Sequence, residues 1–96
     1  MPEVGEPVLE EKIYQLAGLI NNVPPEIVAE FDDLFQGMLA KNYSVDHYKG
    51  FLGGIIAAFH LLGEELPEQQ QLALGHAAIY LAHKLVEEKI LQSFYH

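Results

Sequence analysis

Residues 67–94 constrain the fold more than any other stretch, because only Gly75 interrupts them and their apolar residues form two separate stripes. One stripe has the alternating spacings of four and three that mark one face of a helix: Leu72, His76, Ile79, His83, Val86, Ile90 and Phe94. The other lies roughly 160–180° further round the helix: Leu74, Ala78, Leu81 and Leu85. A helix with two opposed apolar sides needs partners on both sides. We therefore expect this segment to be the central helix of a bundle or to lie at an interface.

Three further helices are predicted before it, at residues 7–21, 25–41 and 45–62. Pro7 and Pro25 suit the first turn of a helix, and Ser44 is a typical N-cap. Residues 1–6 contain Pro2 and Gly5 and are expected to be disordered. The sequence therefore predicts one all-α domain over residues 1–96, in which short loops join four helices into an up-and-down bundle.

The fourth predicted helix is longer than its neighbours. At 1.5 Å per residue it spans about 40 Å, whereas the first three span roughly 20 to 28 Å. Half of the residues in the chain are hydrophobic, more than so short a chain buries easily. We therefore expect a homodimer whose contact surface begins towards the end of this helix. The predicted interface residues are Val86, Ile90, Leu91, Phe94 and Tyr95.

Small residues form a stripe on the third predicted helix, at Gly50, Gly54 and Ala58. Each glycine inside a helix costs about 1 kcal/mol relative to alanine, so some other interaction should offset the loss. Our main interpretation is close packing of another helix backbone against this stripe. The alternative is a binding module, in which Gly50, Gly53 and Gly54 leave room for a small apolar ligand between the third and fourth helices.

The charge balance limits the classes of partner. Fourteen acidic residues face five lysines, there is no arginine, and the net charge is −9. Nucleic-acid binding is disfavoured, because it depends on clustered Lys and Arg that neutralise phosphates. A basic protein partner would suit this charge, which also keeps an apolar-rich chain in solution. Glu26, Glu30 and Asp33 share one face of the second helix, and we interpret that face as its solvated side.

Enzymatic activity, membrane insertion and secretion are not predicted. The apolar run at residues 51–62 is shorter than the ~20 residues of a membrane span, and no secretory signal is visible. The chain lacks cysteine and threonine, and its two serines are Ser44 and Ser93. Ser44, Asp46 and His47 lie too close in sequence for a triad, because adjacent helical positions diverge by about 100°. We expect a cytoplasmic protein without a cofactor.

Histidine offers the other chemistry to consider. If the third and fourth helices pair as an antiparallel hairpin, His47 comes level with His83, and Glu87 lies one turn away. These three residues are the one three-ligand metal cluster that the pattern allows. Partly buried histidines that hydrogen-bond within the fold explain the same pattern, so no metal is predicted.

Residues 47–51, His-Tyr-Lys-Gly-Phe, resemble the motif of histidine-phosphotransfer domains, which are four-helix bundles of similar size. In that family a helical histidine precedes a Lys-Gly pair, which would imply phosphotransfer at His47. Two residues separate the histidine from the lysine in the family and one does here, which turns Lys49 about 100° away. His47 also lies in the first turn of its helix. The chain is therefore not assigned to that family.

Together these observations predict a small acidic interaction or regulatory protein that is not an enzyme and associates with itself through its helices. The small-ligand module is the alternative, and a histidine-based metal or phosphotransfer site ranks below it.

Overall fold

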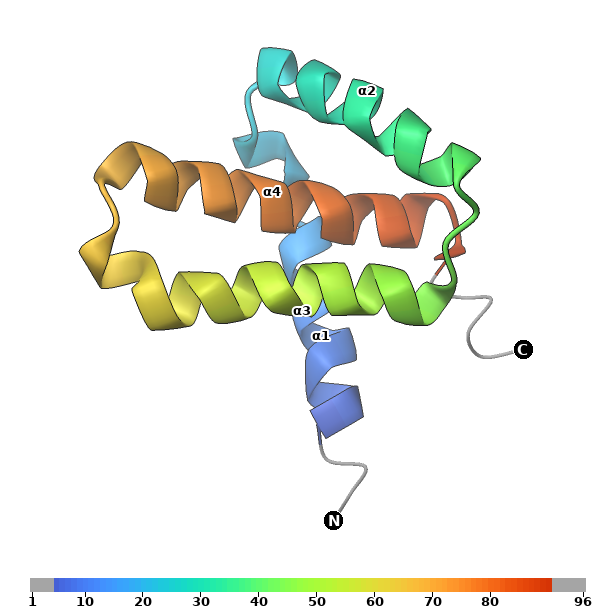
Figure 1. Ribbon diagram of the computed structural model, residues 1–96, viewed down its shortest axis with the longest axis horizontal. Helices are drawn as coiled ribbons and strands as arrows, with labels where there is room; N and C mark the ends of the chain where they lie inside the picture. The colour runs from blue at the N-terminus through green and yellow to red at the C-terminus, as the bar shows by residue number, and fades with distance from the viewer. Residues whose placement is uncertain (1–4, 91–96) are drawn as a thin grey trace.

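The structure of the protein is a computed structural model that describes the backbone of residues 5–90 and the side chains of residues 11–90. These residues form four α-helices and two short 3-10 helices (Figure 1), and no strand occurs among them. The elements in order are α1 (Gly5–Ala17), η1 (Ile20–Asn22), α2 (Pro25–Ala40), α3 (Val45–Leu62), η2 (Gly63–Glu65) and α4 (Glu68–Glu87). The predicted all-α class is confirmed.

The start of α3 shows how local sequence sets a boundary. Ser44 is the N-cap, and its Oγ accepts a hydrogen bond of 3.2 Å from the backbone N–H of His47. A hydroxyl at this position satisfies one of the N–H groups that the first turn of a helix leaves unpaired. As a result α3 begins at Val45, where the sequence predicts it.

α4 is the central helix, because α1, α2 and α3 all pack against it. Figure 1 shows α3 antiparallel beside α4, α2 along the other side of α4, and α1 crossing steeply behind the α3–α4 pair. The expected antiparallel hairpin of the third and fourth helices is therefore present. The up-and-down arrangement of all four helices is not, because α1 crosses the others instead of running alongside them.

One hydrophobic core joins the four helices. Its largest fully buried side chains are Ile13 of α1, Phe35 of α2, Leu52 of α3 and Leu85 of α4. The stripe predicted to run from Leu74 to Leu85 supplies much of the α4 part of the core, since Ala78 and Leu81 are buried in it as well. Tyr80 and Ala82 are also buried, between the two predicted stripes.

Two predicted helix ends are wrong, and so is the predicted start of the first helix, because α1 begins at Gly5, inside the residues 1–6 expected to be disordered. α1 stops at Ala17 because Gly18, a poor helix former, begins a turn that leads into η1. α4 stops at Glu87, and Lys89 follows with φ 60°, in the left-handed region that often ends a helix. With 20 residues in α4 and 18 in α3, the two helices span about 30 and 27 Å, so α4 up to Glu87 is little longer than α3. Residues 91–94 of the expected overhang lie outside the described residues.

The left-handed Lys89 yields a test of where α4 ends. Lys89→Gly should raise the free energy of unfolding by about 1 kcal/mol, because glycine adopts positive φ without a steric penalty. If the helix instead continued through this position, the same change would lower the stability by a similar amount. Urea denaturation of the two proteins measures the sign.

Candidate functional site

A polar network joins α2 to α4. The Tyr80 hydroxyl donates a hydrogen bond of 2.6 Å to Asp32 Oδ1 on α2. Lys84 Nζ lies 3.4 Å from the same oxygen and 2.9 Å from Glu87 Oε1. Tyr80, Lys84 and Glu87 follow one another at spacings of four and three, so they share one face of α4. Tyr80 and Lys84 reach Asp32, and Glu87 binds Lys84.

The network fixes the protonation state of its members. Burial raises the pKa of the Tyr80 hydroxyl, and the bond to Asp32 raises it further. The hydrogen bond from Tyr80 and the charge of Lys84 lower the pKa of Asp32. Burial alone would lower the pKa of Lys84, but Glu87 and Asp32 raise it overall, and Lys84 in turn lowers the pKa of Glu87. None of these pKa values moves towards neutrality, so the network acts as a structural clamp and is unsuited to acid–base catalysis.

Two aromatic rings complete the junction between α2 and α4. The ring centroids of Phe31 and Phe35 lie 5.2 and 6.1 Å from that of Tyr80. Lys84 Nζ lies 5.9 Å from the Phe35 centroid and 5.7 Å from the Tyr80 centroid, within the range of cation–π attraction. Asp32 therefore pairs with Lys84, whose ammonium group also lies close to the rings of Phe35 and Tyr80.

The predicted His47, His83 and Glu87 cluster does not form. His47 Nδ1 lies 2.8 Å from Ser44 Oγ, and its ring stacks on Tyr43 with centroids 5.6 Å apart. His83 Nε2 instead lies 3.5 Å from Glu87 Oε2. Residues 11–90 contain no group of three His, Asp or Glu side chains placed to hold a metal ion. Contacts within its own N-terminal turn hold His47 away from the predicted ligand set.

The phosphotransfer resemblance does not extend to the side chains. Lys49 is buried, with 7% of its surface exposed, whereas His47 is exposed. The two side chains therefore lie on different sides of α3, as their spacing predicts.

The glycine stripe faces solvent. Gly50 and Gly54 are exposed, and a Cβ atom added at either position would meet no heavy atom within 4 Å apart from its chain neighbours and its own helix backbone. The predicted close packing of a helix on Gly50, Gly54 and Ala58 is therefore wrong within the chain. The reason is that α3 turns its Leu52 side towards the core, and only Ala58 of the stripe is half-buried. A ligand beside Gly50, Gly53 and Gly54 stays a prediction.

The solvent side of α3 is unusually apolar. No Asp, Glu or Lys occurs from Gly50 to Leu62, although the outer side of a surface helix normally carries charge. Leu61, Leu62 and Phe51 are 78%, 49% and 38% exposed. We call this surface the α3 outer face and define it by its exposed members: Gly50, Phe51, Gly54, Ala57, Leu61 and Leu62.

The predicted interface at the end of α4 is only partly within the described residues. Val86 and Ile90 are half-buried and pack against the core of their own chain. Leu91, Phe94 and Tyr95 lie outside the described residues. Among the described residues, large exposed apolar side chains occur on all four α-helices, and α3 carries the most of them. The described part of the α4 end does not add to this surface.

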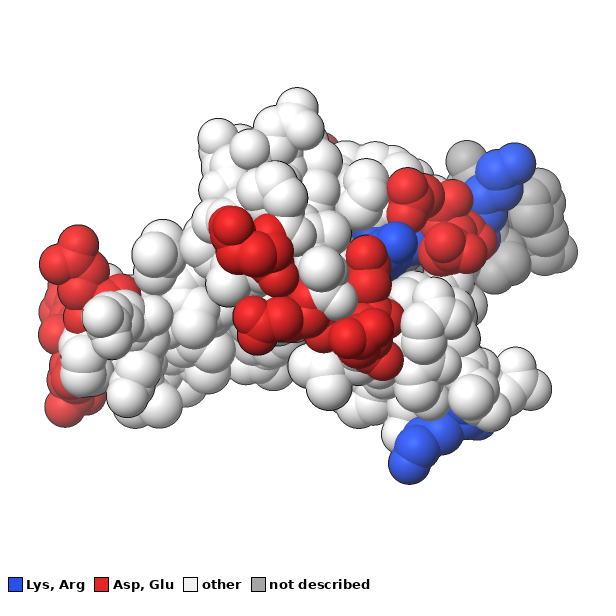
Figure 2. Space-filling view, turned by 90° about the horizontal axis from the view of Figure 1, so that it is seen from above, with Lys and Arg blue, Asp and Glu red and all other residues white. Residues whose placement is uncertain are grey.

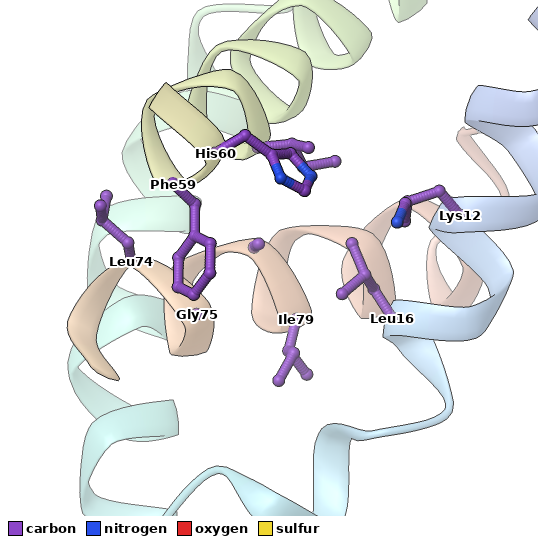
Figure 3. A pocket seen from close by; sticks show the side chains of 9 residues that line it. Lys12, Leu16, Phe59, His60, Leu74, Gly75 and Ile79 are labelled. Carbon is purple, nitrogen blue, oxygen red and sulfur yellow. The ribbon is translucent and has the colours of Figure 1, made fainter. Parts of the chain in front are cut away.

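A cavity of about 220 Å³ lies where α1, α3 and α4 meet (Figure 3). Its apolar wall consists of Leu16 from α1, Ile56 and Phe59 from α3, and Leu74, Ala78 and Ile79 from α4. Gly75 also lines it, and so do Lys12 of α1 and His60 of α3. Sequence reasoning missed this site, although His60 gives one signal because it interrupts an otherwise apolar run. Lys12 gives none, since it is one of several lysines on predicted helix surfaces.

Comparison of the chain with protein-family models, with curated proteins and with solved structures finds no match. No helix among those described has both the length and the apolar character that crossing a membrane requires.

The Tyr80–Asp32 bond gives a pH-dependent prediction. Because the folded state lowers the pKa of Asp32, the contribution of this carboxylate to stability is present at neutral pH and is lost below about pH 4, as the pH falls through the folded pKa. The melting temperature of wild type should therefore exceed that of Asp32→Asn at pH 7, and the difference should shrink as the solution is acidified.

Tyr80→Phe provides the matched variant. It removes the hydroxyl donor but keeps the ring, so we expect a melting temperature several degrees below wild type at pH 7. A difference between wild type and Asp32→Asn that stayed constant from neutral to acidic pH would contradict the assignment.

Proposed function

We propose that the protein is a non-enzymatic protein–protein interaction module that forms a homodimer through the α3 outer face. The observation that carries the proposal is the uncharged, exposed side of α3 from Gly50 to Leu62. A helix that is apolar on both sides is normally buried on both sides, and α4 covers only one side of α3. A cytoplasmic location belongs to the same proposal, because a chain without cysteine suits a reducing compartment.

The charge distribution favours the α3 outer face as the place where two copies of the chain meet. With a net charge of −9, two copies repel each other wherever carboxylates would meet. Figure 2, seen from the α2 side, shows acidic side chains gathered over the middle of the molecule and at one end. The exposed acidic residues of the chain include Glu26, Glu30 and Asp33 on α2, and Glu64 and Glu65 in η2. The α3 outer face lets two acidic chains meet without burying unpaired carboxylates.

Small side chains explain how the contact would be made. Gly50, Gly54 and Ala57 follow one another along α3 at spacings of four and three, so they share one line on its surface. Two α3 helices related by a two-fold axis would approach closely along this line, with Leu61 of each copy packing beside it. The packing free energy of such a contact would offset the helix stability that the glycines cost.

A basic protein is the second candidate partner. The exposed acidic residues of α2 favour it, since complementary charge speeds encounter and selects partners. Such a partner would bind α2 and would leave the α3 outer face available for the dimer.

Gly54→Leu separates folding from association. The added side chain has room in the single chain, because no heavy atom lies within 4 Å of its Cβ, and it should stabilise the helix by up to about 1 kcal/mol. In the dimer the same side chain would hold two backbones apart. We expect wild type to have twice the chain mass of 10.8 kDa in analytical ultracentrifugation and the variant to sediment as a monomer.

Gly37→Leu is the matched control. Gly37 lies inside α2, is exposed and has equally open surroundings, so this variant should gain helix stability and remain dimeric. Leu61→Glu adds a charge to the α3 outer face without burying it in the single chain, and it should also dissociate the dimer. A wild-type protein that stays monomeric at high concentration would refute the proposal, as would a Gly54→Leu dimer.

A further inference from the structure

The cavity between α1, α3 and α4 has a charge that is opposite to that of the chain. Its wall contains two titratable side chains, Lys12 and His60, and both are basic. This is unexpected in a protein with fourteen acidic residues and five lysines. Each of three neighbouring hollows contains at least one glutamate: Glu26 and Glu30 between α2 and α4, Glu68 at the start of α4, and Glu64 beside η2.

The rest of the wall is apolar and is shaped by three helices. Leu16, Phe59 and Ile79 reach it from α1, α3 and α4. Gly75 keeps the α4 side open, because a Cβ added there would meet no heavy atom within 4 Å. The volume of about 220 Å³ lies below the ~300–1,000 Å³ of sites for drug-sized molecules, so the space suits a small ligand with an alkyl body.

Lys12 can supply a charge for the head of such a ligand. Its side chain is half-buried at the cavity and forms no ion pair with any acidic residue among those described. Figure 3 shows Lys12 and His60 at the cavity, from α1 and α3 respectively. An ammonium group and an imidazole can both donate hydrogen bonds, and an ionised acceptor strengthens such bonds.

We infer that this cavity binds a small amphiphile that has an alkyl chain and a single carboxylate, such as a medium-chain fatty acid. The alkyl chain occupies the apolar space beside Gly75, and the carboxylate lies between Lys12 and His60. The residues that line this site differ from those that define the α3 outer face, although Phe59 and His60 are exposed residues of the same helix. Binding and dimerisation can therefore fail separately.

The head group is tested first with the wild-type protein. Decanoate, decanol and decyltrimethylammonium are titrated into it by calorimetry, below the concentrations at which they form micelles. Decanoate should saturate one site and bind about tenfold more tightly than decanol, because only the carboxylate pairs with Lys12. Equal affinities for decanoate and decanol would overturn the inference. Tighter binding of decyltrimethylammonium than of decanoate would also overturn it, and the net negative charge of the protein alone favours that result.

Two variants then locate the site. Lys12→Met keeps most of the apolar stem and removes the charge, so its affinity for decanoate should fall about tenfold to the level of decanol, while decanol binding stays unchanged. Gly75→Leu should fill the space and abolish binding, whereas the matched Gly37→Leu should bind as wild type does. Circular dichroism checks that each variant is folded. Decanoate binding that survives in folded Gly75→Leu would place the ligand elsewhere and refute the assignment.

Discussion

The packing of three helices around α4 is the constraint on which the rest of the structure depends. α4 buries Leu81, Ala82 and Leu85 in a core to which every other helix contributes, while α1, α2 and α3 make their main contacts with α4. Because the core has one centre, each outer helix is covered mainly on the side that faces α4. The exposed apolar side of α3 and the cavity beside α1 both follow from this arrangement.

The sequence predicts the centre of the fold better than its periphery. The stripe from Leu74 to Leu85 contains residues of α4 that the core buries, whereas the described residues of the opposed stripe are at most half-buried and its Leu72 is 60% exposed. Ser44 marks the start of α3 because capping is a local interaction. The end of α4 could not be predicted, because the residue with the left-handed backbone is Lys89 and neither glycine nor proline occurs near it in the sequence. The steep crossing of α1 was also beyond reach, because a short loop indicates proximity but not the angle between two helices.

The candidate sites show the same limit. Periodicity identifies a small-residue stripe on α3 but does not tell whether its partner is in the same chain, and the structure leaves Gly50 and Gly54 exposed. The Tyr80–Asp32 bond and the cavity each combine residues that are distant in sequence, with Lys12 and Gly75 brought together only by the fold. Composition did predict more apolar surface than the chain can bury. The predicted length of the fourth helix placed that surface at its end, where Leu91, Phe94 and Tyr95 lie outside the described residues.

The central position of α4 also sets an order of folding. α3 and α4 are neighbours in sequence, so their antiparallel pair can form after closing only the short connection at η2. The contacts between α1 and α4 join opposite ends of the chain, and long-range contacts pay a larger entropy of loop closure. During synthesis α1 and α2 emerge from the ribosome before α4 and have no surface to pack on until it follows. Of the four described α-helices, the last to be made is the one on which the other three fold.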